Sequence, residues 1–199
     1  MLGQPLIARD DLVLLGDHNV ANALAAALAV MCADETHAPP GNRAKIAQAL
    51  RAFRALEHRI EPAGCYAGVE WINDSKSTNV ASTLVALKGM AKPTVLLLGG
   101  RHKGEPYDSL APELQRTVKL VIAYGEAAPI VEQDLDGVVA LERVNGSFDD
   151  VIERARAAAV AGDAVLLSPA CSSYDMFDNY EQRGRTFKRL ASGQGGGEG

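Results

Sequence analysis

From about residue 58 onward, short apolar runs alternate along the chain with segments of helical spacing. An apolar run without polar interruption is typical of a strand buried on both faces of a parallel sheet. Strands that alternate with helices at this spacing indicate a doubly wound sheet. We therefore expect an α/β, Rossmann-like fold with a mostly parallel sheet. The predicted strands are 94–100, 118–125, 137–141 and 162–170, and the predicted helices between them are 109–115, 128–135 and 147–160.

Two further elements flank this pattern. Residues 64–74, GCYAGVEWIND, alternate in polarity and contain glycine, which is typical of an antiparallel hairpin. In the helix 147–160, Ser147 is the expected N-cap. A final helix is predicted from an aromatic and small-residue stripe that ends before a glycine-rich tail at 192–199. The stripe consists of Phe177, Tyr180, Gly184, Phe187 and Ala191.

The first 57 residues have a different character. A short β-like piece at 11–16 precedes a helix that we expect to begin near Asp17 or Asn19, and a second helix is expected at 43–56. Two helices are too little for an independent domain, so residues 1–57 are assigned to the end of one domain and 58–191 to another. We expect an exposed apolar surface on the two helices, around Val20, Leu24, Ile46 and Leu50.

Composition excludes several classes of function. The 199 residues are 47% hydrophobic with a net charge of −5, and no basic run appears, which argues against nucleic-acid binding. The longest apolar run, Ala23 to Ala33, is about half of what a bilayer requires. The N-terminal residues lack the pattern of a secretory signal. We therefore expect no membrane insertion and a cytoplasmic location, with the three cysteines reduced and mostly buried.

Three polar loops follow strands of the predicted sheet, at Asn73–Asn79, 99–104 (GGRHKG) and 168–175 (SPACSSYD). The carboxyl ends of parallel strands share one edge of a sheet, where ligands bind. These loops therefore predict a binding site, although capped strand-to-helix turns also favour the same residue types. Lys103 could offer a point charge to a carboxylate or phosphate, or it could be an ordinary solvated lysine.

Motifs for catalysis by this chain are missing. Glu105 and Pro106 follow GGRHKG where a phosphate-binding P-loop requires Lys and Ser or Thr. Neither a nucleophile elbow around Ser172 and Ser173 nor an S-x-x-K motif occurs. The four histidines lack metal-ligand spacing, and Cys171 is more typical of packing than of a reactive thiol. We therefore assign no catalytic or metal-binding residue.

Five segments resemble, in order, the carboxy-terminal part of the Mur ligases: GDHNVANALAAALAV, HRIE, WINDSKSTNVAST, LLLGGRHKG and LLSPACSSYDMFDNYEQRGRTF. The resemblance extends from about residue 10 to 191 and favours the branch that adds D-glutamate to UDP-N-acetylmuramoyl-L-alanine in peptidoglycan precursor synthesis. It implies an ATP- and Mg²⁺-dependent ligase of three domains. In such a ligase ATP phosphorylates the substrate carboxylate, and the D-glutamate amine attacks the acyl-phosphate to form an amide.

The resemblance also implies roles for individual residues. For the nucleotide, Asn22 would contact the adenine, Arg59 the phosphates and Asp74 the ribose, with Lys76 nearby. D-Glutamate would be surrounded by Thr78, Lys103, Ser173 and Tyr180, with Tyr174 offering its backbone. The family usually has phenylalanine near position 180 and leucine near 174. D-Glutamate carries two carboxylates, which suit Lys103 together with hydroxyls and helix N-terminal amides.

The resemblance leaves out the family's UDP-binding domain and most of its ATPase domain, with the phosphate loop, the magnesium ligands and a modified lysine. Residues 1–57 would be the last part of the ATPase domain. We therefore expect no ligase activity from this chain alone, and a requirement for an N-terminal half in cis or in trans. Two alternatives stay open: a free-standing module that binds a nucleotide or an acidic amino acid, and an inactive truncated remnant.

Overall fold

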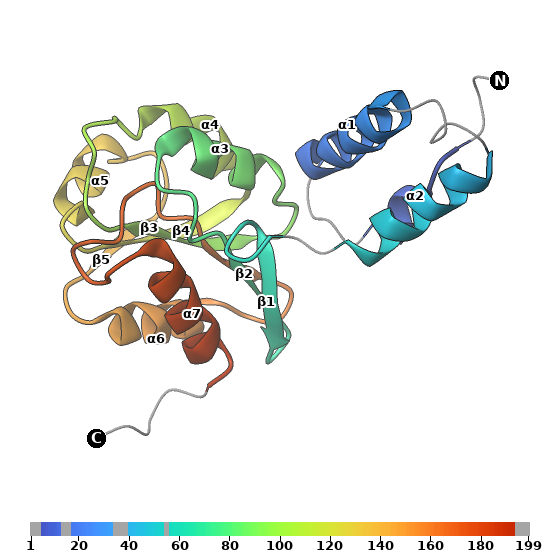
Figure 1. Ribbon diagram of the computed structural model, residues 1–199. Helices are drawn as coiled ribbons and strands as arrows, with labels where there is room; N and C mark the ends of the chain where they lie inside the picture. Colours follow the sequence, from blue (N-terminus) through green and yellow to red (C-terminus); the bar gives the residue numbers. More distant parts are fainter. Residues whose placement is uncertain (1–4, 13–16, 34–39, 54–55, 194–199) are drawn as a thin grey trace. The chain divides into compact units, whose positions relative to one another are not determined.

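Three apolar runs form the centre of a six-stranded sheet in the computed structural model (Figure 1). In β3 and β6 every residue is buried, and in β4 only Lys119 is exposed. The strand order is β1-β2-β6-β3-β4-β5, and every pair is parallel except β1 with β2. The strands are β1 (Glu61–Tyr66), β2 (Val69–Asn73), β3 (Thr94–Gly99), β4 (Val118–Tyr124), β5 (Leu141–Val144) and β6 (Ala164–Leu167).

The structure describes residues 5–12, 17–33, 40–53 and 56–193, and the chain divides into two units, Met1–Ala55 and Leu56–Gly199. The sheet belongs to the second unit. The assignment of residues 1–57 and 58–191 to two ligase domains stays a prediction. The predicted tail at 192–199 falls almost wholly outside the described residues.

Helices cover both faces of the sheet, which confirms the predicted doubly wound fold. Helices α3, α4 and α5 lie on one face, and α6 and α7 lie on the other (Figure 1). The helices are α3 (Val80–Lys88), α4 (Ala111–Thr117), α5 (Ala128–Asp134), α6 (Phe148–Ala158) and α7 (Tyr180–Ala191). A short 3-10 helix, Asp108–Leu110, precedes α4.

The main core lies between the sheet and the pair α6 and α7. Trp71 of β2 is 1% exposed and packs on Phe187 of α7, with 5.7 Å between the ring centroids. Phe148 of α6 contacts Tyr124 of β4 and, on its other side, Phe177. Aromatic rings bury large apolar areas, so this cluster fixes α7, and with it the loop before α7, against the sheet.

Several predictions of detail were wrong. The strand predicted at 137–141 begins only at Leu141, because Gly137 adopts a left-handed φ of 70° in a turn in which Val138 donates to the Leu135 carbonyl. Phe177 lies outside the final helix, which begins after the N-cap Asn179. Only Cys171 is buried, whereas Cys32 and Cys65 are exposed on a helix surface and an edge strand.

The N-terminal unit contains a 3-10 turn, Arg9–Asp11, and the helices α1 (Asp17–Ala33) and α2 (Pro40–Ala52). Helix α2 begins at a proline, a residue favoured at the first helical position, and so starts before the predicted residue 43. Most of the predicted β-like piece at 11–16 lies outside the described residues.

Helix α1 buries small residues and exposes large ones. Ala23 and Ala27 are 7% and 4% exposed, whereas Leu24 is 50% and Leu28 is 62% exposed. Val20, Ile46 and Leu50 are half-buried. The predicted exposed apolar surface is therefore found at Leu24 and continues to Leu28.

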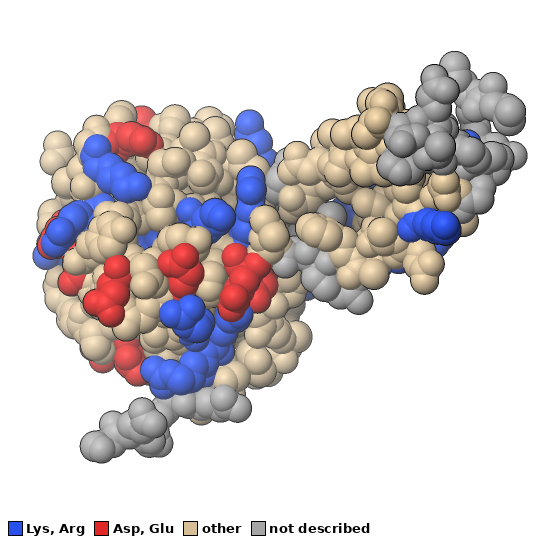
Figure 2. Space-filling model, viewed as in Figure 1, with Lys and Arg blue, Asp and Glu red and all other residues tan. Residues whose placement is uncertain are grey.

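The surface of the second unit carries both signs of charge, and acidic and basic side chains are interspersed over the face seen in Figure 2. In the described ranges, no helix has the length and apolar character needed to cross a bilayer.

Ser147 provides a test of how local sequence fixes this fold. It caps α6 with a reciprocal pair of bonds, in which its hydroxyl accepts from the Asp150 amide and its own amide donates to the Asp150 carboxylate. The substitution Ser147→Ala should lower the free energy of unfolding by about 1 kcal/mol in urea denaturation. Ser109→Ala, at an exposed serine, should change it by less than about 0.5 kcal/mol. Equal effects of the two substitutions would contradict a capping role.

Candidate functional site

The three polar loops meet at one edge of the sheet because β2, β6 and β3 are parallel neighbours. The backbone amide of Asp74 donates to the Leu167 carbonyl over 2.8 Å, which joins the loops after β2 and β6. Arg101 and Ser172 exchange two backbone hydrogen bonds, of 2.9 and 3.2 Å, which join the loops after β3 and β6. The sequence-based expectation that these loops share one edge is therefore confirmed.

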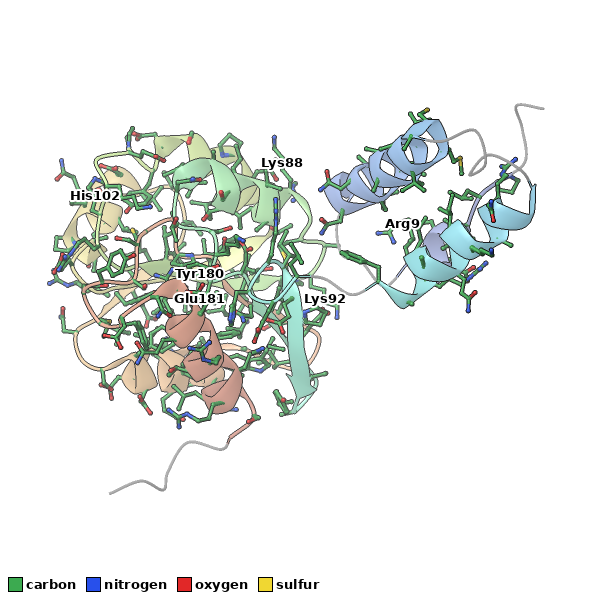
Figure 3. The ribbon with its side chains drawn as sticks, in the orientation of Figure 1. Arg9, Lys88, Lys92, His102, Tyr180 and Glu181 are labelled. Carbon is green, nitrogen blue, oxygen red and sulfur yellow. The ribbon has the colours of Figure 1, made fainter. Side chains whose placement is uncertain are left out.

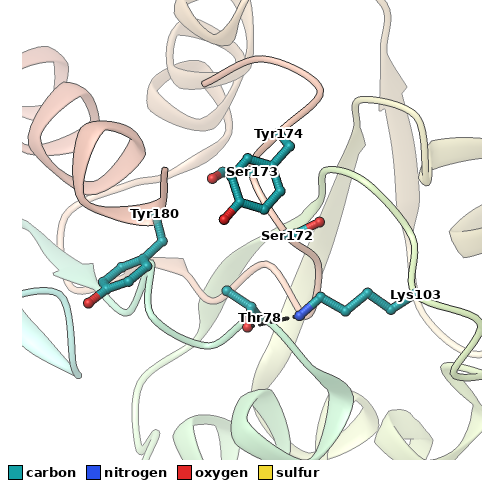
Figure 4. A pocket seen from close by; sticks show the side chains of 6 residues that line it. All are labelled: Thr78, Lys103, Ser172, Ser173, Tyr174 and Tyr180. Atoms are coloured by element: carbon teal, nitrogen blue, oxygen red, sulfur yellow. Dashed lines mark hydrogen bonds between the residues drawn. The ribbon is translucent and has the colours of Figure 1, made fainter. Parts of the chain in front are cut away.

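A pocket of about 220 Å³ lies where the loops meet (Figure 4). Five of its six lining residues are those predicted for D-glutamate, and Ser172 is the sixth. The Lys103 ammonium reaches across the pocket and donates to the Thr78 hydroxyl over 3.1 Å. The lining residues are Thr78, Lys103, Ser172, Ser173, Tyr174 and Tyr180.

The chemistry of the pocket favours an anion. Within the described residues, no carboxylate lies at ion-pair distance from Lys103, whose charge faces hydroxyl groups instead. Ser173 is 2% exposed, and its carbonyl accepts from the Met176 and Phe177 amides, which fixes the turn that presents its hydroxyl. An ammonium group among hydroxyl donors can bind a carboxylate or a phosphate by charge-assisted hydrogen bonds.

The structure changes one expectation about the pocket, namely the role of helix N-terminal amides. The resemblance suggested helix N-terminal amides as ligand donors, yet the first amide of α3, that of Val80, donates to the Glu105 carboxylate over 3.0 Å. Asn79 caps the same helix by accepting from Ser82. Glu105 thus occupies the positive end of α3 and attaches the Lys103 loop to it.

Arg183 is fully buried and connects two of the three loops. Its Nε donates to the Ser75 hydroxyl over 2.9 Å, and its terminal nitrogens donate to the carbonyls of Ser75 and Cys171. Ser75 in turn donates to the Tyr180 carbonyl over 2.8 Å. In the part of the chain that the structure describes, no carboxylate pairs with Arg183. Sequence reasoning missed this residue because a charged side chain on a helix is usually exposed.

Gly100 is required where the loops cross. Its φ of 126° disfavours any side chain, and a Cβ there would collide with the Ser172 carbonyl and approach the Arg183 guanidinium. The close approach permitted by this glycine allows Arg101 to pair with Ser172.

Asp74, predicted to hold a ribose, is 1% exposed. One carboxylate oxygen accepts from the Ile60 amide over 3.1 Å, and the other accepts from the Ser168 hydroxyl over 2.7 Å. Burial raises the pKa of Asp74 to about 6, although hydrogen bonds from Ser77, Ser168 and Ile60 act in the opposite direction. In this structure Asp74 ties the start of the second unit to the loop after β6.

The other predicted nucleotide residues lie in different surroundings. Lys76 is exposed, and its ammonium lies 5.8 Å from the ring centroid of Tyr180. Tyr180 and Glu181 stand together in the first turn of α7 (Figure 3). Arg59 is exposed beside Ile60, and Asn22 is exposed on α1 in the other unit. The structure thus brings together the predicted D-glutamate residues, while the roles of all nine residues stay predictions.

A metal site is not evident in this part of the chain. Among the described residues, no three His, Cys, Asp or Glu side chains are grouped so as to hold an ion.

Comparisons with known proteins identify the family. Residues 58–171 match the family model described as "Mur ligase, glutamate ligase domain". The chain is 40% identical to the UDP-N-acetylmuramoylalanine–D-glutamate ligase of Salinibacter ruber over 185 residues, which cover 93% of this chain and 39% of that protein. The chain therefore spans about two fifths of the length of such curated relatives.

Solved structures share the fold at low identity. UDP-N-acetylmuramate–alanine ligase from Thermotoga maritima superposes with a TM-score of 0.64 at 16% identity, covering 92% of this chain and 40% of that one. MurF ligase from the same organism, solved in complex with ADP, has a TM-score of 0.50 at 14% identity, covering 74% and 34%.

Replacing Arg183 tests whether it holds the loops. Arg183→Met keeps much of the side-chain volume but leaves the carbonyls of Ser75 and Cys171 without their donors. Because unpaired buried polar groups are costly, the free energy of unfolding should fall by about 3 kcal/mol in urea denaturation. Arg185→Met, at another exposed arginine of the same helix, serves as the control and should change it by less than about 0.5 kcal/mol. A loss for Arg183→Met no larger than that control would count against the role.

Because the pKa of Asp74 is raised, the free energy of unfolding should depend on pH. An acid with a higher pKa in the folded state than in the unfolded state binds its proton more tightly when folded. Its contribution to stability is therefore complete below pH 4 and is lost as pH rises through 6. Between pH 4 and 7.5, wild type should lose about 2 kcal/mol relative to Asp74→Asn in urea denaturation.

The pKa of Asp74 can also be measured directly. In ¹³C NMR the Asp74 carboxyl should titrate near pH 6, whereas Asp150, whose pKa is lowered by hydrogen bonds from Ser147, should titrate below the usual range of an aspartate. Titration of Asp74 near pH 4 would show that burial does not raise the pKa of this carboxyl group.

Proposed function

The chain belongs to the Mur ligase family, and from this membership we propose that it supplies the D-glutamate-binding part of a ligase. The reaction would join D-glutamate to UDP-N-acetylmuramoyl-L-alanine at the expense of ATP, in peptidoglycan precursor synthesis. The support from sequence is the 40% identity to a protein named for this reaction. We place the reaction in the cytoplasm, where ATP is available.

The observation that carries the proposal is the Lys103–Thr78 contact across a pocket otherwise lined by hydroxyl groups. D-Glutamate presents two carboxylates and one amine. An unpaired lysine and several hydroxyl donors suit the carboxylates, and the pocket contains no carboxylate to attract the amine. Binding through the carboxylates would leave the amine free to react.

ATP would supply the phosphoryl group that activates the muramoyl-alanine carboxylate as an acyl-phosphate. The D-glutamate amine would then attack the acyl carbon, the amide bond would form, and phosphate would leave. The residues described here contribute by holding and orienting D-glutamate. Holding two reactants in the correct orientation removes a large part of the activation barrier of such a bimolecular reaction.

We keep Asn22, Arg59, Asp74 and Lys76 as the proposed nucleotide contacts. Arg59 and Lys76 are exposed cations that could meet phosphates, and a Mur ligase of the same fold was solved with ADP. Magnesium ligands are proposed to lie outside the described residues.

One observation favours the alternative of a free-standing binding module. All six residues that line the pocket belong to the second unit. A micromolar dissociation constant for D-glutamate with this chain alone would favour that alternative over a ligase part. A millimolar one fits a pocket that is completed by other parts of an enzyme.

Titration of the ¹⁵N-labelled chain with D-glutamate tests the proposal. Amide shifts should appear at Thr78, Lys103 and Ser173, with a millimolar dissociation constant and weaker binding of L-glutamate. Lys103→Met, which keeps the length of the side chain and removes its charge, should raise the dissociation constant about tenfold.

The matched control is Lys92→Met. Lys92 is also exposed, but it pairs with Glu70 over 3.0 Å and does not line the pocket. Its replacement should leave D-glutamate binding unchanged. The proposal is wrong if wild type shows no shifts with D-glutamate, or if the two lysine variants bind it equally well.

A further inference from the structure

Tyr107 lies behind the pocket and does not line it. The side chain is 1% exposed, and its hydroxyl contacts two groups, the Nδ1 atom of His102 at 3.0 Å and the Sγ atom of Cys171 at 2.9 Å. His102 belongs to the loop after β3, and Cys171 belongs to the loop after β6. One phenol oxygen therefore bridges two of the loops that form the pocket.

The two bridged residues flank the place where the backbones of these loops join. His102 follows Arg101 and Cys171 precedes Ser172, and Arg101 and Ser172 form the paired backbone hydrogen bonds. The bridge is antiparallel, so Lys103, the residue after His102, and Ser173, the residue after Ser172, leave the junction in opposite directions. The Tyr107 bridge and the backbone junction together hold the two segments that present Lys103 and Ser173.

The bridge is compatible with the protonation states at neutral pH. Burial raises the pKa of Tyr107 well above its usual range, and burial raises the pKa of the Cys171 thiol to about 11. Both groups are therefore neutral. A phenol has one donor and can also accept, so it can donate to one neighbour and accept from the other in either histidine tautomer.

Tyr107 is itself fixed by the structure around it. Its amide donates to the Asp134 carboxylate over 3.0 Å, and its carbonyl accepts from Leu110 over 2.9 Å. Its ring packs on the His102 ring with 5.5 Å between centroids. Lys103, by contrast, is exposed, and its ammonium contacts only the Thr78 hydroxyl among the hydrogen bonds of the described residues.

We propose that Tyr107 is a positioning residue, whose hydroxyl locks the Lys103 loop to the Ser173 loop through His102 and Cys171 and so sets the geometry of the pocket. The consequence for D-glutamate rests on the proposed function, whereas the locking of the loops does not. The two parts are therefore tested separately.

Amide hydrogen exchange tests the locking without any ligand. Tyr107→Phe keeps the ring and removes both hydroxyl contacts, so exchange at the Arg101 and Ser172 amides should accelerate at least tenfold. Exchange at the Leu97 amide, in the centre of the sheet, reports overall stability and should accelerate much less. Equal acceleration at all three amides would reduce Tyr107 to general stabilisation and overturn the proposal.

Tyr66→Phe is the matched control for loss of a tyrosine hydroxyl. That hydroxyl donates to the Ala63 carbonyl within the β1 edge strand and does not touch the pocket loops. The exchange rates of Arg101 and Ser172 should be unchanged in this variant.

The second readout is the dissociation constant for D-glutamate, measured by the same NMR titration. Tyr107→Phe should raise it about fivefold, and His102→Ala should have a similar effect. His102→Asn can place an amide atom close to the position of Nδ1, so it should restore most of the affinity. Faster exchange with unchanged affinity, or no rescue by asparagine, would contradict positioning. If wild type itself fails to bind D-glutamate, the proposed function fails, and the exchange rates alone decide whether Tyr107 locks the loops.

Discussion

The candidate site depends on one buried cation, the guanidinium of Arg183. A charged group removed from water is costly unless its hydrogen bonds are satisfied, and here Ser75 and Cys171 supply acceptors instead of a carboxylate. Carbonyl oxygens have fixed positions in the backbone, so satisfying Arg183 also fixes the two loops that carry them. The interaction that makes burial of this arginine tolerable therefore brings Thr78 and Ser173 to one pocket.

Cys171 is the point at which two such connections meet. Its carbonyl accepts from Arg183 on one side, and its sulfur contacts the Tyr107 hydroxyl on the other. Through these two bonds the loop after β6 is attached to the loop after β2 and to the loop after β3. A buried thiol with a raised pKa suits this place because it stays neutral and fits a tightly packed position. The sequence suggested a packing role for Cys171, and the structure adds these hydrogen bonds.

Much of the fold could be predicted from the sequence, and the limits have physical causes. Continuous apolar runs are hard to place elsewhere than in the centre of a parallel sheet, so β3 and β4 were predicted nearly to the residue, and β6 was located although it is shorter than the predicted 162–170. The strand β5 was shifted because Gly137 forms a turn that hydropathy does not reveal. At the site, the loops and Lys103 were predictable from residue types. The burial of Arg183 and the bridge by Tyr107 were not, because both depend on contacts between residues far apart in the sequence.

An anion site needs charge that is not already neutralised, and the arrangement of this pocket preserves such charge. The nearby carboxylate of Glu105 is engaged by the Val80 amide at the start of α3, and no carboxylate of the described residues pairs with Lys103. Glu126, another acidic residue near the loops, is held by Arg101 over 3.0 Å. These two acidic side chains are thus bound to other partners, and the only hydrogen bond of the Lys103 ammonium among the described residues is to the Thr78 hydroxyl. Because the loops are held from behind by buried groups, Lys103 can remain exposed to a ligand while its backbone stays in place. The proposed recognition of a dicarboxylate rests on this division between a fixed interior and an unpaired surface cation.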